Sequence, residues 1–471
     1  MDLGSFYPLI DLYCSSWYTP FAYLRSDSVA DVQPFRGLRY NLEQIGDLSM
    51  VISPPFDVVS SEEQILYHLR SPYNVIRLEF GEERPKDSPR DNKYTRAAQT
   101  MESWLRQAIL VREEHPAFYL VEHRFRYQNS LRSRFGLIAR VRLEDLSTGQ
   151  IRLHERTMRG PALDRRRLLQ SCRANFNPIM GMFQHEGEGI GSLFREVKVK
   201  SPTLSAMDNY GAAHYIWVVT DEKTIAQVSD FFADKILYIA DGHHRYETAL
   251  AYHRDQRSAL SSYSGKEAFN FVMMVLMDSE DPNLIMFTPH RLVQGLEAET
   301  LERLEKGLGA YFHKELLPPL ATQSETLESW LHALKREGHS GAILGLYGLH
   351  GQHLCLLQVR EKEALVERMP ADWPSPLKDL NVSLLHWVIL RQMLGIDSAE
   401  KEESCLEYTR DGLEALSRVD SGAFQLAFLL NPVPISSVLA ASDTGVRMPP
   451  KSTYFYPKTP TGLVINPLWD D

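Results

Sequence analysis

The chain of 471 residues has only four cysteines, Cys14, Cys172, Cys355 and Cys405, and none of them form a CxxC pair. So few and so widely separated cysteines exclude a disulfide scaffold and fit a reducing compartment. No basic region precedes an apolar run at the N-terminus, so we expect no signal peptide. No apolar stretch reaches the roughly 18 residues that a membrane span requires. These absences predict a cytoplasmic protein without a membrane partner.

Several catalytic signatures are also absent. His154-Glu155 lacks the second histidine of the HExxH zinc motif, and there is neither a GxSxG elbow nor a GxGxxG fingerprint. The segment from Gly445 nearly spells a P-loop, but Pro450 replaces the glycine before Lys451. Proline has no N–H to offer a phosphate, so a P-loop is excluded. Lys451 and Lys458 remain as anion contacts or as parts of a rigid C-terminal strap.

The net charge of −10 disfavours a nucleic-acid partner, because an acidic protein repels a phosphate backbone. One stretch has the opposite sign: residues 123–173 contain thirteen arginines and no lysine. A solvated strand face and a helix surface account for most of them. We expect two or three to meet an anionic ligand, because the guanidinium fork suits carboxylate and phosphate.

The length predicts more than one domain, since single cores stop growing near roughly 250–300 residues. We expect an N-terminal extension over 1–32, a catalytic domain over 33–290 and a C-terminal α/β domain over 291–471. A capping box at Ser60 and Glu63 starts a helix, another spans 95–110, and a helix begins near Asp164, whose carboxylate would cap it. Alternating apolar residues predict strands at 117–125 and 135–143, a pair that looks like a hairpin. Further strands are expected at 214–219, 236–240, 269–277, 342–347, 354–359 and 424–430, of which 236–240 and 269–277 would be buried. The alternation with helices indicates a mixed α/β (α+β) fold.

The strongest functional signal is Asp241-Gly242-His243-His244-Arg245, between a predicted buried strand and a helix. The free amides at a helix N-terminus favour anions, and Gly242 lets the backbone approach a ligand. Arg245 adds a bidentate cation. Asp241 can cap the helix, hold a metal ion or accept a proton, and the two histidines can donate to an anion or shuttle a proton. The alternative is an Asp-capped helix with two surface histidines.

A second polar segment lies after the predicted hairpin. Glu155 is a candidate general base, and Arg159 or Arg165 is a candidate phosphate clamp. The alternative is a salt-bridged loop. Further candidate substrate contacts in and near this segment are His154, Thr157 and Asn175.

A third segment, Val51 to Asp57, is typical of a strand that ends in two prolines, which make a rigid extended turn. Asp57 either projects into a pocket or caps the next element of the chain.

Five segments in order resemble a widespread prokaryotic family known as domain of unknown function 1015. They are Phe35–Tyr40, Pro54-Pro-Phe-Asp57, His154–Thr157, the turn at 241–245, and Met448–Gly462. Where members of the family commonly carry tyrosine, this chain has Phe56. Gly242, Arg245 and Ala249 are also similar to the G-x-x-R-x-x-x-A box of the ParB/sulfiredoxin superfamily, which includes free serine kinases. The resemblance implies a ParB/sulfiredoxin-like core with a large N-terminal elaboration.

The same resemblance implies a nucleotide, ATP or ADP, and Mg²⁺ as cofactors, with Asp241 on the metal and residues 242–245 on the phosphates. The acceptor would be a small hydroxylated metabolite such as serine, with Glu155 or Glu247 as the base; Glu247 could instead only cap the helix. One rival is a phosphohydrolase acting on phosphoserine or a similar monoester. The other rival is a nucleotide-binding regulatory protein without enzymatic activity. In each case the partner is a small anionic or phosphorylated molecule, and the oligomeric state stays open.

Overall fold

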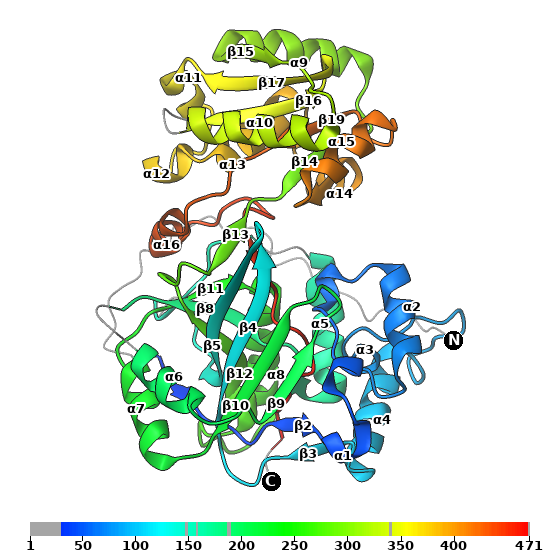
Figure 1. Cartoon of the computed structure of the whole chain (residues 1–471), viewed down its shortest axis with the longest axis vertical. Helices are drawn as coiled ribbons and strands as arrows, with labels where there is room; N and C mark the ends of the chain where they lie inside the picture. The colour runs from blue at the N-terminus through cyan, green and yellow to red at the C-terminus, as the bar shows by residue number, and fades with distance from the viewer. Residues whose placement is uncertain (1–29, 147–148, 157–158, 186–189, 339–341, 470–471) are drawn as a thin grey trace, which may run out of the picture.

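A computed structural model describes residues 30–146, 149–156, 159–185, 190–338 and 342–469. Nearly all of the predicted N-terminal extension lies outside these ranges. The described chain forms a large N-terminal unit and a smaller C-terminal unit, each built on one main sheet with helices packed against it (Figure 1). The predicted mixed α/β class is therefore confirmed. No helix in the described part of the chain is long and apolar enough to span a membrane.

The N-terminal unit is organised by a nine-stranded sheet in the order β6-β11-β8-β12-β5-β4-β10-β9, with β1 also paired to β5. The predicted hairpin is confirmed as β4 and β5, and β10 extends it antiparallel to β4. Near the other edge, β11 is antiparallel to β8 and parallel to β6. The strands are β1 (Val32–Gln33), β4 (Phe118–Tyr127), β5 (Ser130–Arg142), β6 (Ile151–Arg152), β8 (Ile179–Phe183), β9 (Leu204–Met207), β10 (Ala213–Val219), β11 (Leu237–Asp241) and β12 (Phe271–Asp278).

Helices cover this sheet, and two of them, α5 and α8, contact each other. The helix predicted to begin at Asp164 instead begins at Arg159, so Asp164 lies inside α5 and does not cap it. Its carboxylate accepts from the Tyr94 hydroxyl at 2.8 Å and pairs with Lys93 at 2.7 Å. The helices are α4 (Lys93–Arg106), α5 (Arg159–Cys172), α6 (Gly191–Lys198), α7 (Glu222–Phe232) and α8 (His243–Ala259).

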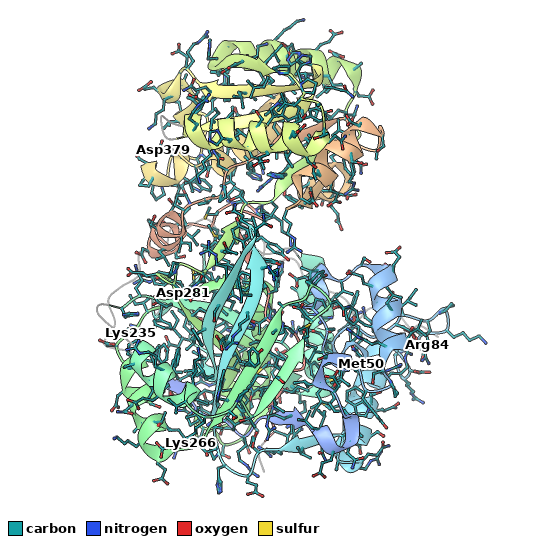
Figure 2. The ribbon with its side chains drawn as sticks, in the orientation of Figure 1. Met50, Arg84, Lys235, Lys266, Asp281 and Asp379 are labelled. Carbon is teal, nitrogen blue, oxygen red and sulfur yellow. The ribbon has the colours of Figure 1, made fainter. Side chains whose placement is uncertain are left out.

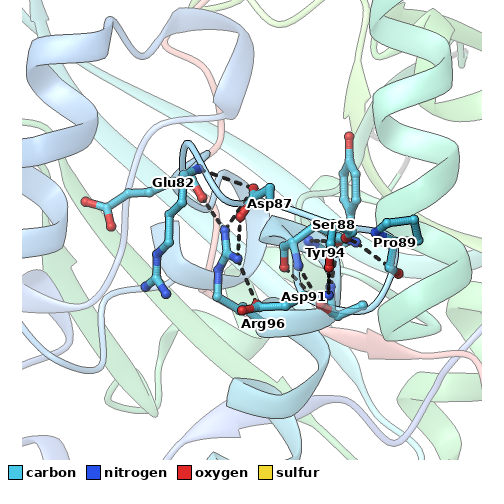
Figure 3. Close-up of polar contacts among 10 residues, drawn as sticks. Glu82, Asp87, Ser88, Pro89, Asp91, Tyr94 and Arg96 are labelled. Atoms are coloured by element: carbon cyan, nitrogen blue, oxygen red, sulfur yellow. Dashed lines mark hydrogen bonds and ion pairs between the residues drawn. The ribbon is translucent and has the colours of Figure 1, made fainter.

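The Ser60–Glu63 capping box is present at the start of α2 (Ser61–Arg70). The charged segment 81–92 is a loop whose side chains fold back on the start of α4. There Arg96 binds Asp87 at 2.7 Å and the carbonyl of Glu82 at 2.8 Å (Figure 3). The remaining short elements here are β2 (Leu38–Tyr40), α1 (Leu42–Ile45), η1 (Leu48–Met50), η2 (Phe56–Val58), α3 (Ile76–Glu79), β3 (Leu110–Arg112), β7 (Ala174–Asn175), η3 (Ala268–Asn270) and β13 (Ile285–Phe287).

The C-terminal unit has a six-stranded sheet in the order β15-β17-β16-β19-β14-β18. Three of its strands confirm the predictions at 342–347, 354–359 and 424–430, while β14, β15 and β18 were not expected. The strands are β14 (His290–Val293), β15 (Phe312–Leu317), β16 (Ile343–Gly348), β17 (Gly351–Val359), β18 (Leu406–Thr409) and β19 (Leu426–Leu429). The helices are α9 (Ala298–Tyr311), α10 (Gln323–Glu337), α11 (Lys362–Val366), α12 (Ser375–Lys378), α13 (Asn381–Leu384), η5 (Leu385–Met393), α14 (Ala399–Cys405), α15 (Gly412–Asp420) and α16 (Ile435–Asp443).

After α16 the chain returns to the N-terminal unit, drawn in red in Figure 1. We call residues 446–462 the strap. Its strand β20 (Tyr454–Tyr456) pairs with β13, and single bridges join Met448 to Glu155 and Thr461 to Ser53. Beyond the strap, β21 (Asn466–Pro467) pairs with β7. The domain boundaries stay a prediction, but this pairing attaches the last segment to the N-terminal unit.

The arginine-rich stretch is used mainly for internal contacts. Arg124 binds Glu122 through two hydrogen bonds of 3.0 Å, and the guanidinium groups of Arg140 and Arg142 stack on Phe271. Arg134 does not lie on a solvated face, as we expected for most of these arginines, because its side chain is fully buried. Charged groups that do lie on the outside include Arg84, Lys235 and Lys266, at the margins of the N-terminal unit in Figure 2.

Candidate functional site

The turn at 241–245 has the predicted strand–turn–helix geometry. Strand β11 ends at Asp241, and α8 begins at His243. Gly242 has φ +96°, which an L side chain rarely adopts, and a Cβ there would lie 2.9 Å from the guanidinium of Arg245. No described side chain caps α8. The alternative in which Asp241 caps the helix is therefore wrong. The first amides of the helix therefore have no capping side chain, which favours an anion there.

Arg245, which the sequence suggested as a phosphate contact, folds back against the protein. Its guanidinium binds the Asp241 carboxylate at 2.8 Å and the carbonyl of Pro178 at 2.7 Å, and it also contacts the side-chain oxygen of Asn177. Asn177 in turn donates to the carbonyl of Thr459 at 3.0 Å. Arg245 thus ties together the end of β11, the residues before β8 and the strap.

Two carboxylates share one ammonium group at the open side of this turn. Lys458 of the strap lies 2.8 Å from Asp57 and 2.5 Å from Asp241. Desolvation opposes the ionisation of Asp57, but the charges of Lys458 and Arg245 outweigh it and hold its pKa below the usual range. Burial disfavours the charged form of Lys458, but the two carboxylates raise its pKa above the usual value. Asp57 and Lys458 are therefore both charged near neutral pH.

A cleft of about 650 Å³ opens beside these residues, a size that suits a small molecule. One wall consists of Asp57, Lys451 and Lys458, so the turn at 241–245 lies behind Lys458 and is not itself part of the lining. Strand β18 and the start of α15 supply lining residues from the C-terminal unit. The other lining residues are Pro54, Pro55, Val58, Asp208, Tyr210, Ala212, Pro289, Leu406, Glu407, Tyr408, Thr409, Arg410, Asp411, Glu414, Tyr454, Tyr456, Pro457 and Pro460.

Lys451 is the second lysine of this cleft wall. Within the described ranges it forms no ion pair, whereas Lys458 has two. Burial raises the pKa of Glu155, and Lys451 partly opposes that shift. Burial, together with the charge of Lys451, lowers the pKa of His244 to about 4. Both effects place the charge of Lys451 close to Glu155 and His244.

The two other histidines of the predicted site are buried beneath it. The rings of His154 and His243 meet edge to face with centroids 4.5 Å apart, and His154 Nε2 lies 2.9 Å from the Thr453 hydroxyl. Burial lowers the pKa of His154 to about 3 and moves the pKa of His243 well below its usual value. Both are therefore neutral near pH 7, and neither lines the cleft.

Three other predicted residues, Arg165, Asn175 and Glu247, do not line the cleft. Arg165 is buried, donates to the carbonyl of Glu79 at 2.9 Å, and packs 3.8 Å over the ring of Phe56. Asn175 accepts from the amide of Met273, a structural contact. Glu247 pairs with Arg447 of the strap at 4.0 Å. Thr157 lies outside the described residues, as does the side chain of Arg159.

The structure also shows residues of the site that the sequence did not indicate. Asn177 holds Arg245, and its only signal was its place in an Asn-Pro pair after a short strand. The Asp57–Lys458–Asp241 cluster joins three distant segments, and no spacing rule connects them. The described residues contain no group of three or more His, Cys, Asp or Glu side chains suited to a metal.

With this geometry established, comparisons with known proteins give a family. The model of the family described as protein of unknown function (DUF1015) matches residues 32–383, which is most of the chain. The chain belongs to this family. No curated protein matches it.

Some solved structures are similar at low TM-scores. A conserved hypothetical protein from Pyrococcus furiosus has a TM-score of 0.33 and 13% identity, covering 69% of this chain and 93% of its own. A free serine kinase in complex with AMP has a TM-score of 0.34 and 13% identity, covering 71% and 90%. SbnI with a C-terminal truncation, from Staphylococcus aureus, has a TM-score of 0.32 and 10% identity, covering 68% and 84%. Likeness at this level carries no argument about activity.

Proposed function

We propose that this protein is a phosphotransferase that moves a phosphoryl group between a nucleotide and a small hydroxylated metabolite such as serine. The observation that carries the proposal is the cleft wall, where the unpaired Lys451 lies beside the Asp57–Lys458–Asp241 cluster. Phosphoryl transfer depends mainly on positioning and on neutralising charge, and the two lysines of this wall supply positive charge for both.

In this proposal Lys451 holds the phosphate that enters the cleft. Lys458, kept charged by two carboxylates, stabilises the negative charge that develops during transfer. Arg245 acts by fixing Asp241 and is not a phosphate contact. This assignment replaces the direct phosphate role that the sequence suggested for the arginine.

Glu155 is the proposed base for the acceptor hydroxyl. Its pKa is raised by burial, which moves it towards the range in which a carboxylate accepts a proton well near neutral pH. Glu247 is the weaker candidate, because its carboxylate already pairs with Arg447.

A magnesium ion fits this site only in company with a nucleotide. Asp57 and Asp241 offer carboxylate oxygens, but both contact Lys458, and the described residues provide no third protein ligand nearby. Mg²⁺ is commonly held by one or two carboxylates together with substrate phosphates, which is the arrangement that these residues suit. Such an ion would neutralise charge on the phosphates.

The test is a thermal-shift screen with ATP, ADP, CTP, serine and phosphoserine, each with Mg²⁺. A ligand at 100 times its dissociation constant stabilises the protein by about 2.7 kcal/mol, which is readily detected. We expect a nucleotide to raise the melting temperature of the wild type and of Lys266→Met, a change on the outer surface (Figure 2), but not that of Lys451→Met. Equal shifts in all three proteins would contradict the proposed site.

Two rival functions give different results with the same ligands. A phosphohydrolase would release phosphate from phosphoserine and Mg²⁺ without a nucleotide, whereas the proposed transferase would not. A regulatory protein would bind nucleotide but transfer no label from γ-³²P-ATP to serine.

A further inference from the structure

The strap carries both lysines of the cleft wall, and each lysine lies next to main-chain carbonyls that a buried arginine binds. Arg134 comes from β5 of the N-terminal unit, and Arg291 comes from β14 of the C-terminal unit. The exposed fraction is 0% for Arg134 and 3% for Arg291. The strap is therefore held at two points by two different parts of the fold.

Arg134 holds the part of the strap that precedes Lys458. Its two terminal nitrogens donate to the carbonyls of Tyr456 and Pro457, at 2.9 and 2.6 Å. Both acceptors come directly before Lys458, so the contact sets where the lysine leaves the backbone. Burial lowers the pKa of Arg134 to about 10, which still leaves it charged near neutral pH.

Arg134 is part of a buried polar row across three neighbouring strands. It lies opposite His123 on β4, which lies opposite His214 on β10. The two histidines approach Nδ1 to Nδ1 at 2.6 Å, and His214 Nε2 lies 3.0 Å from Asp208. Burying charged and polar groups costs stability unless partners satisfy them. The Nε atom of Arg134 has no partner within the described residues, so the two strap carbonyls are the acceptors that hold its buried guanidinium in place.

Arg291 makes the corresponding contact at the other lysine. One nitrogen donates to the carbonyl of Lys451 at 3.1 Å and lies 3.5 Å from that of Pro450, while another binds the carbonyl of Pro289. Lys451 itself has φ +56°, a conformation that a residue with a side chain adopts at a cost unless its surroundings impose it. The arginine supplies such a constraint.

We infer that Arg134 and Arg291 are positioning residues, Arg134 for Lys458 and Arg291 for Lys451. Because the two anchors belong to different units, the C-terminal unit takes part in setting the cleft wall through Arg291, besides supplying other lining residues. That the two lysines act on a phosphate rests on the proposed function. The anchoring itself does not.

The first experiment measures hydrogen–deuterium exchange by mass spectrometry on strap peptides 446–453 and 454–462. Arg134→Met should raise exchange in 454–462 by about tenfold, the factor for ~1.4 kcal/mol of lost local stability, and leave 446–453 unchanged. Arg291→Met should raise exchange in 446–453 and leave 454–462 unchanged, so each variant is the matched control of the other. Methionine is chosen because it fills similar volume without a charge. Equal increases in both peptides, or none, would overturn the inference.

Should a methionine variant fail to fold, the lysine variants carry the same test. Arg134→Lys and Arg291→Lys keep the charge and one donor, so a smaller increase confined to the same peptide is expected. An increase in the other peptide would overturn the assignment.

The second experiment asks whether each arginine acts through its lysine, using inorganic pyrophosphate with Mg²⁺ as the probe. Arg291→Met should weaken binding in the wild type by about tenfold but have no further effect in Lys451→Met, because the lysine is then already absent. Arg134→Met should likewise weaken pyrophosphate binding in the wild type by about tenfold but have no further effect in Lys458→Met. Additive losses would overturn this part of the inference. Failure of the wild type to bind pyrophosphate would count against the proposed function, while the exchange result would still decide the anchoring.

Discussion

Arg245→Met tests whether the arginine of the 241–245 turn is a structural tie or a ligand contact. In the structure its guanidinium has three kinds of partner: the Asp241 carboxylate, the Pro178 carbonyl and the Asn177 side chain. Its side chain is 15% exposed, so solvent can replace few of these contacts. Removing the guanidinium leaves the Pro178 carbonyl and the Asn177 side-chain oxygen without this donor.

The expected loss of stability can be worked out from these contacts. Taking away one partner of a buried charged pair costs about 3–5 kcal/mol, and an unsatisfied buried acceptor costs about 1–3 kcal/mol. The loss for Arg245→Met is smaller than their sum, because Asp241 keeps Lys458 as a partner and both groups are partly exposed. We expect about 3 kcal/mol.

The assay is native-state hydrogen exchange of peptides from β11 and α8, where about 3 kcal/mol corresponds to roughly a hundredfold faster exchange. The matched control is Arg254→Met on the same helix, whose ion pair with Asp145 is 64% and 58% exposed. An exposed pair of this kind contributes at most about 1 kcal/mol. If Arg245→Met is as stable as Arg254→Met and loses pyrophosphate binding, the structural reasoning is refuted and the ligand role that the sequence suggested is restored.

Three further predictions concern neighbouring groups. Gly242→Ala should destabilise α8 by about 1–3 kcal/mol, because of its φ of +96° and the close approach of Arg245, and exchange of α8 amides will measure this. Glu155→Gln should leave the nucleotide-induced thermal shift intact and abolish transfer; unchanged turnover would show that Glu155 is not the base. The pKa of Asp57 is lowered in the folded state, so the free energy that its charge contributes to folding is fully present above the unfolded carboxyl pKa of about 3.9. That contribution declines as the pH falls towards the lower folded pKa. Urea unfolding should therefore show the advantage of wild type over Asp57→Asn shrinking below about pH 4, and a constant advantage down to about pH 2 would contradict the pairing with Lys458.

Local sequence patterns predicted where the turn of the site lies, but they did not predict the contacts that its side chains make. The turn at Gly242 comes after a buried strand and begins a helix, as its residues indicate, because backbone geometry at a turn depends on near neighbours. The contacts of Arg245 within the protein were not predicted, because its partner Asn177 is supplied by a segment far away in the chain. Likewise Asp164 was expected to cap a helix but lies within it, paired with Lys93.

By itself, the sequence determined the mixed α/β class, the main hairpin and the strand that leads into the Asp241–Arg245 turn, because these depend on residue periodicity and on local turn chemistry. Only the tertiary structure decided which charges line the cleft and which pair within the protein. It paired Lys458 with Asp57 and Asp241, turned Arg245 inward and left Lys451 unpaired among the described residues. The physical reason is that a side chain's partners depend on which distant segments the fold brings within hydrogen-bond reach, and no spacing along the chain encodes that distance.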